Sequence, residues 1–75
     1  MQDLNDMVFF AEVAERGGFA AASRALGIPK SRLSRRVAEL EDQLGVQLMQ
    51  RSTRRLSLTP AGEIYLRHAA SVRDA

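Results

Sequence analysis

The segment between Gly27 and Gly45 constrains the fold more than any other part of the chain. Its apolar residues follow the i, i+4, i+7, i+11 pattern of one narrow helical stripe: Leu33, Val37, Leu40 and Leu44. Gly27 suits the left-handed conformation that ends a preceding helix, and the fixed φ of Pro29 suits the first turn of the next one. We therefore expect a helix over residues 30–44 that ends at Gly45 and packs through a single face.

The polar side chains of this predicted helix differ between its two halves. Stepping about 100° per residue from Leu33 places hydroxyl and basic residues on the outward face of the first half. With Lys30 at the start of the helix, these are Ser31, Arg32, Ser34 and Arg35. Acidic residues gather in the second half: Glu39, Glu41 and Asp42. The first half thus adds basic side chains to the positive end of the helix dipole, a combination suited to DNA.

Three charged residues have competing interpretations. Arg36 lies nearer the core edge, so a salt bridge within the domain and a DNA contact are equally good interpretations of it. The same holds for Arg24, which precedes the turn. Glu41 is expected to close an internal ion pair and not to touch a ligand.

Two shorter helices are predicted before Gly27. Residues 4–16 carry apolar side chains at helical spacing, and two glycines then end that helix. Residues 19–26 are rich in alanine, whose small side chain lets a neighbouring helix approach closely. Together with the helix that follows Gly27, the second of these forms a helix-turn-helix.

The apolar pattern after Gly45 is typical of short strands. Two arms with alternating or paired apolar residues flank a polar centre, which predicts a β-hairpin over residues 48–58 with its turn around Ser52 to Arg54. The hairpin carries three arginines: Arg51, Arg54 and Arg55.

A fourth helix is predicted to begin at Thr59 and Pro60, which form an N-cap and N1 pair. One stripe of this helix is expected to pack on the domain: Ala61, Tyr65, Ala69 and Val72. Leu66 and Ala70 then remain for another partner, such as a second copy of the chain.

These elements predict a mainly α fold: a winged helix-turn-helix with a three-helix core, a short two-stranded β-hairpin wing and a C-terminal linker helix. We place the winged helix-turn-helix at residues 1–58 and the start of a linker or dimerisation helix at residues 59–75. A chain of 75 residues makes one small domain that needs nearly all its apolar residues for the core. A roomy catalytic cavity is therefore not expected.

Composition excludes several classes of site. The chain has no cysteine and a single histidine, His68, so thiolate and histidine-cluster metal sites are excluded. Because no nucleophile and base pair and no glycine-rich phosphate loop is present, we expect no enzyme activity, no cofactor and no catalytic or metal site. The longest unbroken apolar run, residues 7–11, is far too short to span a bilayer. We expect a soluble cytoplasmic protein without a membrane partner.

The formal net charge is only +2, but residues 24–60 hold eight basic and three acidic side chains. Such a block is often only a solvated face, yet its position favours phosphate contact by Arg54 and Arg55. A protein-interaction or RNA-binding module on the same scaffold is the alternative. It is disfavoured because RNA recognition generally stacks bases on aromatic side chains, and the one tyrosine lies on a helix that should be packed.

The chain resembles the N-terminal DNA-binding domain of LysR-type bacterial transcriptional regulators. The resemblance rests on three stretches in order, "FFAEVAERGGFAAASRALGI", "SRLSRRVAELEDQLGVQLMQR" and "RRLSLTPAG", and extends from about Leu4 to Leu66. It implies sequence-specific binding of double-stranded DNA, with the helix over residues 30–44 in the major groove and the hairpin on the flanking backbone or in the minor groove. It also implies a homodimer through the C-terminal helix, with a higher oligomer possible in the full-length protein.

The residues and the resemblance together define the candidate site. The DNA-binding candidates are Lys30, Ser31, Arg32, Ser34, Arg35, Arg51, Arg54 and Arg55. The dimerisation candidates are Tyr65, Leu66, Ala69 and Ala70. Family members continue past the linker helix into an effector-binding domain, so a small-molecule effector is expected only for a domain missing from these residues. The resemblance also implies a bacterial protein associated with the nucleoid.

The chain departs from the family pattern in three ways. Pro29 and Lys30 stand where the family commonly has serine and glutamine, Gly18 stands where serine is frequent, and Met49 stands where phenylalanine is usual. The first departure removes a helix cap and an amide suited to reading adenine, whereas Lys30 favours phosphate or guanine.

Overall fold

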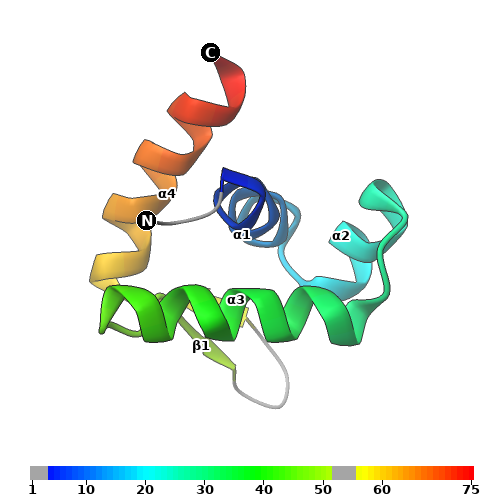
Figure 1. Cartoon of the computed structure of the whole chain (residues 1–75), viewed down its shortest axis with the longest axis horizontal. Helices are drawn as coiled ribbons and strands as arrows, with labels where there is room; N and C mark the ends of the chain where they lie inside the picture. Colours follow the sequence, from blue (N-terminus) through cyan, green and yellow to red (C-terminus); the bar gives the residue numbers. More distant parts are fainter. Residues whose placement is uncertain (1–3, 52–55) are drawn as a thin grey trace.

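The described part of the chain forms three helices, then a hairpin, then a final helix. A computed structural model describes residues 4–51 and 56–75. In chain order their elements are α1 (Leu4–Arg16), α2 (Phe19–Leu26), α3 (Lys30–Leu44), β1 (Met49–Arg51), β2 (Leu56–Leu58) and α4 (Pro60–Asp74). The helices predicted over residues 4–16, 19–26 and 30–44 are therefore confirmed. Figure 1 shows α3 along one side of the molecule, α1 and α2 above it, and α4 rising from the side where α3 ends.

The turn between α2 and α3 is fixed by one glycine and one serine. Gly27 has a φ of 69°, in the left-handed region, and its N–H donates to the Ser23 carbonyl oxygen at 2.9 Å. The Ser23 hydroxyl donates to the Ile28 carbonyl oxygen at 2.6 Å. Pro29 lies at the N-cap of α3 and not in its first turn, because its ψ of 140° is extended. The two helices are thus held in a fixed mutual orientation.

The core lies where α1, α3 and the start of the hairpin meet. Its largest fully buried side chains are Phe10, Leu33, Leu40, Leu48, Met49, Val13 and Val37. The stripe predicted for α3 is confirmed, with Leu44 only partly buried at its end. Each large side chain buried in this way contributes roughly 1.5–3 kcal/mol to stability. The apolar face of α3 is therefore used by the domain itself.

The junction between the hairpin and α4 depends on Thr59 and Gly62. Thr59 is the N-cap of α4: its hydroxyl accepts a hydrogen bond from the Gly62 N–H at 3.0 Å and donates to the Gln47 carbonyl oxygen at 2.6 Å. The Thr59 N–H donates to the Leu48 carbonyl oxygen at 3.0 Å. A Cβ atom at Gly62 would overlap that same carbonyl group. The start of α4 is thus docked directly on Gln47 and Leu48, the two residues that precede β1.

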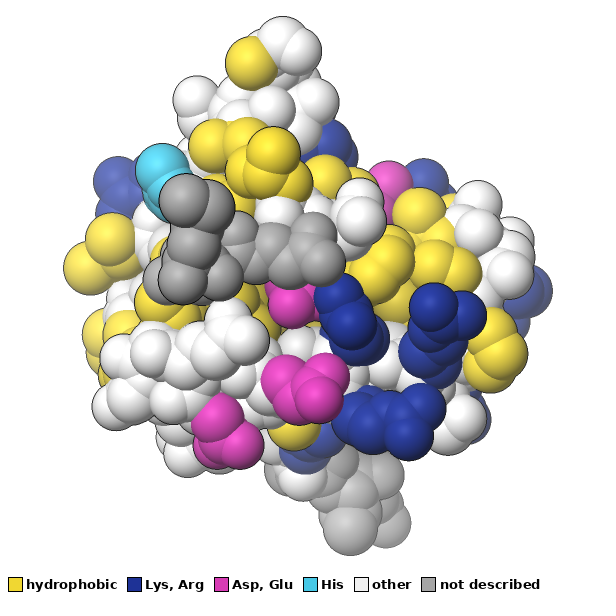
Figure 2. Space-filling view, viewed as in Figure 1, with side chains coloured by type: hydrophobic (Ala, Val, Ile, Leu, Met, Phe, Trp, Pro, Cys, Tyr) yellow, Lys and Arg dark blue, Asp and Glu magenta, His cyan; other side chains and the backbone are white. Residues whose placement is uncertain are grey.

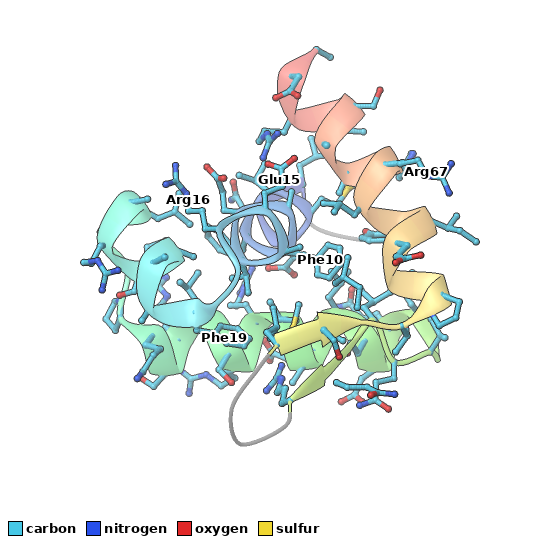
Figure 3. The ribbon with its side chains drawn as sticks, turned by 180° about the vertical axis from the view of Figure 1, so that it is seen from behind. Phe10, Glu15, Arg16, Phe19 and Arg67 are labelled. Atoms are coloured by element: carbon cyan, nitrogen blue, oxygen red, sulfur yellow. The ribbon has the colours of Figure 1, made fainter. Side chains whose placement is uncertain are left out.

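Helix α4 packs along α1. Its Tyr65 ring makes an edge contact with Phe10, with ring centroids 5.6 Å apart, and Figure 3 shows Phe10 pointing into the space between α1, α4 and the hairpin. Near the end of α4, Arg73 pairs with Glu15 at 2.5 Å and with Glu12 at 3.4 Å, both on α1. The linker helix that was predicted to start after residue 58 therefore packs against the rest of the domain. No helix in the described ranges has the length and apolarity needed to cross a membrane.

Candidate nucleic-acid interface

The first half of α3 presents a row of basic and hydroxyl side chains to solvent. Lys30, Ser31, Arg32 and Arg35 are all exposed. Within residues 4–51 and 56–75, none of these four side chains takes part in a hydrogen bond or ion pair. Figure 2 shows Lys and Arg side chains gathered over this half of α3, with acidic side chains over the half where the helix ends. Four of the predicted site residues are thus on one accessible surface.

The start of α3 has no capping side chain. Pro29 occupies the N-cap and makes no side-chain hydrogen bond to the helix, as the loss of the family's serine predicts. The positive end of the helix dipole therefore adds to the charges of Lys30 and Arg32 and is not neutralised by an acceptor from the same turn. An anion is favoured at this end of the helix.

Ser34 and Arg51 are brought into direct contact. From the end of β1, Arg51 donates through Nη1 to the Ser34 hydroxyl oxygen at 2.8 Å and through Nη2 to the Ser34 carbonyl oxygen at 3.2 Å. Its guanidinium carbon lies 5.0 Å from the centre of the Phe19 ring. Its Nη2 is also 3.9 Å from a carboxylate oxygen of Glu41. The hairpin is thereby tied to the exposed face of α3.

Two polar residues farther along α3 are used inside the domain, Arg36 near the middle of the helix and Glu41 in its second half. Arg36 pairs with Asp6 of α1, with 2.7 Å between Nε and Oδ1, and Asp6 is only 3% exposed. Of the two interpretations of Arg36, the structure thus supports the salt bridge. Glu41 accepts hydrogen bonds from the N–H groups of Leu48 at 2.7 Å and Met49 at 3.2 Å. Its internal role is confirmed, although backbone amides are closer partners than Arg51.

A buried charge at Asp6 also affects its neighbour Tyr65. Burial raises the pKa of the Tyr65 hydroxyl above its ordinary value, and the negative charge of Asp6 raises this pKa further. Asp6 was missed by the sequence patterns because its partner is on a different helix. The only local signal is an acid in the first turn of an amphipathic helix, which is common for dipole reasons alone.

The hairpin is described on both sides of its predicted turn. The predicted turn around Ser52 to Arg54, together with Arg55, lies outside the described residues, so the roles of Arg54 and Arg55 stay predictions. The strands on either side pair antiparallel, with Arg51 opposite Leu56. A hairpin at the predicted position is therefore confirmed.

The four residues predicted for dimerisation do not share one surface. Ala69 is fully buried within the domain, and Tyr65 and Leu66 are partly buried against the core. Leu66 was expected to be left for a second copy, but α4 buries a wider face on the domain than one stripe. Ala70 is half-buried. Ala69 has no surface to offer a partner in this fold.

An exposed apolar region beside α4 was missed by the sequence patterns. Ile64 is 65% exposed and Val46 is 42% exposed. They border a shallow groove of about 400 Å³, lined by Leu44, Val46, Leu48, Ala61, Ile64, Tyr65 and His68. The available signal was that Ile64 falls outside the stripe assigned to the core.

Comparison with known proteins identifies the family. Residues 4–63 match the family described as bacterial regulatory helix-turn-helix protein, lysR family. The chain belongs to the LysR family. An HTH-type transcriptional regulator from Xanthomonas campestris pv. campestris (strain 8004) is 49% identical over 70 residues, which cover 93% of this chain and 20% of that protein. The chain thus spans about a fifth of the length of this LysR relative.

Solved structures with the same fold include complexes with DNA. The BenM DBD in its complex with catB site 1 DNA superposes with a TM-score of 0.91 at 32% identity, covering 96% of this chain and 80% of that chain. The CbnR DBD–DNA complex gives a TM-score of 0.90 at 35% identity, covering 96% and 83%. The predicted winged helix-turn-helix is therefore confirmed. The chain is the DNA-binding domain of a LysR-type transcriptional regulator, not an enzyme.

Proposed function

We propose that this LysR-type domain binds double-stranded DNA sequence-specifically as a homodimer, with α3 in the major groove and the hairpin on the flanking backbone or in the minor groove. One observation carries the proposal. The first half of α3 exposes Lys30, Ser31, Arg32 and Arg35 on one surface without partners among the described residues, while the apolar stripe of the same helix is buried. Side chains arranged in this way are available to base edges and phosphates.

Each group in this surface has a distinct proposed role. Arg35 reads a guanine through a bidentate contact, which discriminates against other bases by about 1–3 kcal/mol. Lys30 and Arg32 hold phosphates near the positive end of the helix dipole. In the wing, Arg54 and Arg55 are proposed to contact the backbone because of their charge and their place in the sequence. Ser31 and Ser34 supply hydrogen bonds at the DNA surface.

The dimer is proposed to form through the accessible part of α4. Leu66 and Ala70 are only partly covered by the domain, and Ile64 extends the exposed apolar surface of that helix. Tyr65 contributes its outer edge, and Ala69 is left out because it is buried. The corresponding full-length regulator is proposed to act in the bacterial cytoplasm on nucleoid DNA and to bind a small-molecule effector outside these residues.

Selection of bound duplexes from a random pool tests the proposal. We expect an inverted repeat to be recovered, because a two-fold dimer places its recognition helices on two equivalent half-sites. Arg35→Ala should weaken binding to the selected duplex far more than binding to random DNA. Arg54→Ala should weaken both and reduce the salt dependence by about one unit of slope. Equal losses on both DNAs for Arg35→Ala would contradict the assigned reading role, and recovery of no motif would favour an RNA-binding or protein-interaction module.

A further inference from the structure

Arg51 connects three elements that are distant in the sequence. Its two terminal nitrogens donate to the hydroxyl and carbonyl oxygens of Ser34 on α3, and its guanidinium lies over the ring of Phe19 at the start of α2. Figure 3 shows Phe19 close to the hairpin and α3. A guanidinium held on a ring face and by a two-nitrogen contact has little rotational freedom left. Arg51 is therefore built into the domain despite its exposure.

Strand β1 is fastened to α3 at both of its ends. At its start, the Glu41 carboxylate accepts from the N–H groups of Leu48 and Met49. At its end, Arg51 donates to Ser34. Ser34 and Glu41 are two helical turns apart, so these contacts bind one strand along one stretch of helix. The wing and the exposed face of α3 are thus positioned as a unit.

The contact with Arg51 determines which hydrogen bonds remain available to Ser34. A serine hydroxyl has one donor and two acceptor positions, and the Arg51 Nη1 occupies one of the acceptor positions. A cationic donor also polarises the hydroxyl, which strengthens its O–H as a donor. The nearby positive charge disfavours the approach of a second positively polarised hydrogen. Ser34 is thereby prepared to donate outward.

We infer that Arg51 is a positioning residue that turns Ser34 into a hydrogen-bond donor for DNA, selecting a base with an acceptor edge over the amino group of cytosine. The acceptors that fit are guanine O6 or N7, adenine N7 and thymine O4 in the major groove, whereas cytosine presents only its amino group there. This inference rests on the proposed function, since it names the kind of base that α3 reads. It differs from the simpler role of Arg51 as an independent phosphate contact.

A double-mutant cycle with Arg51→Lys and Ser34→Ala separates these two roles. Lysine keeps the charge for a phosphate but cannot make the planar two-nitrogen contact with Ser34. We expect Arg51→Lys to weaken binding to the selected duplex about tenfold when Ser34 is present, and less than about twofold in the Ser34→Ala background. Both single variants should lose discrimination at the same base pair. The salt dependence should be unchanged.

The opposite pattern would overturn the inference. An independent phosphate contact predicts that Arg51→Lys binds nearly as well as the wild type, and that Arg51→Ala weakens specific and random DNA equally while lowering the salt slope by about 0.9. Arg16→Lys is the matched control, because Figure 3 places Arg16 on the side of α1 away from α3. Thermal unfolding of each variant verifies that binding is measured on folded protein.

A measurement without DNA keeps this inference separate from the proposed function. In the 75-residue chain, we expect the Arg51 guanidinium NMR signals to show slow rotation and a ring-current shift. Ser34→Ala should speed the rotation, because it removes the Nη1 contact and leaves only the contact with the Ser34 carbonyl oxygen, and Phe19→Leu should remove the shift. Guanidinium signals like those of a solvated arginine would overturn the positioning role. If these signals appear as expected but no duplex is selected, the DNA-binding proposal fails and the donor assignment for DNA falls with it.

Discussion

Arg35 and Arg36 are adjacent in α3, yet their surroundings differ completely. The Arg35 side chain is exposed and has no hydrogen bond or ion pair with another described residue, whereas Arg36 pairs with the buried carboxylate of Asp6. One step along a helix rotates a side chain by about 100°, which is enough to move a charge from the solvent face to the edge of the core. Residue type alone therefore does not assign a function to an arginine in this domain.

The same contrast holds for the two halves of the helix. Polar groups in the first half have few partners within the domain, and the helix start is not capped by a side chain. In the second half, Glu41 satisfies two backbone N–H groups of the hairpin. The exposed face of the first half is thus kept available for another molecule at some loss of helix stability, whereas Glu41 in the second half ties the helix to the hairpin.

The largest expected effect on stability comes from Arg36→Ala. Removing this arginine leaves the Asp6 carboxylate buried without its counter-charge, which we expect to lower the free energy of unfolding by about 2–3 kcal/mol. The value is below that of a fully buried pair because the Arg36 side chain is 34% exposed. Urea denaturation measures the change, with Arg32→Ala, at an exposed arginine of the same helix, as the control. Similar losses for the two variants would break the contrast between paired and exposed arginines.

Glu41→Ala should cost somewhat less, about 2 kcal/mol, because the N–H groups of Leu48 and Met49 lose their acceptor. Glu41→Gln keeps an acceptor oxygen and should lose clearly less stability. Denaturation of both variants under one condition provides the comparison. If alanine and glutamine have equal effects, the carboxylate contributes through charge and not through these hydrogen bonds.

A capping residue at the start of α3 should produce a smaller change of opposite sign. Pro29→Ser supplies a hydroxyl to the uncapped first turn and should stabilise the domain by about 0.5 kcal/mol, since the gain from the cap is partly offset by the lost rigidity of proline. Gly18→Ser is the matched change at α2, where a Cβ atom meets no other atom within 4 Å. Thermal unfolding measures both. A destabilised Pro29→Ser variant would show that the missing cap at the start of α3 does not limit the stability of the domain.

The smallest expected effect concerns Tyr65, which lies near the charged Asp6 carboxylate. Because burial and Asp6 raise the folded-state pKa of Tyr65, this residue contributes stability that is fully present below its ordinary pKa of 10.0. That contribution is lost as the pH rises through the folded-state pKa. Tyr65→Phe should show a smaller alkaline loss of stability. Absorbance titration reports the pKa directly because the chain has one tyrosine and no tryptophan. An ordinary pKa in the wild type would contradict both the burial of Tyr65 and the effect of the Asp6 charge on it.

Local patterns predicted the helices well because the periodicity of Leu33 to Leu44 and the glycines at helix ends are properties of neighbouring residues. They also predicted Thr59 as a helix cap, which the structure bears out. They did not predict the pairing of Asp6 with Arg36, which depends on how α1 packs against α3. The need for glycine at residue 62 was likewise hidden, since it arises from the approach of the Leu48 carbonyl.

The candidate site was predicted less completely than the fold. The outward face of the first half of α3 followed from helical geometry, so Lys30 and Arg35 are where the sequence places them. Ser34 and Arg51 were both assigned to DNA, but nothing in their spacing indicated that they bind each other. The exposed apolar surface at Ile64 was missed because the core was assigned as one stripe of α4. Contacts between elements decide such features, and they require the tertiary structure.

The neighbouring variants Arg35→Ala and Arg36→Ala test the central contrast most directly when each is measured for both unfolding and binding to a selected duplex. We expect Arg35→Ala to weaken specific binding about ten- to a hundredfold, with the free energy of unfolding within about 0.5 kcal/mol of the wild type. Arg36→Ala should show the reverse, with lower stability and nearly normal discrimination between selected and random DNA at temperatures where it is folded. Loss of specific binding by folded Arg36→Ala, or a large loss of stability in Arg35→Ala, would contradict the account.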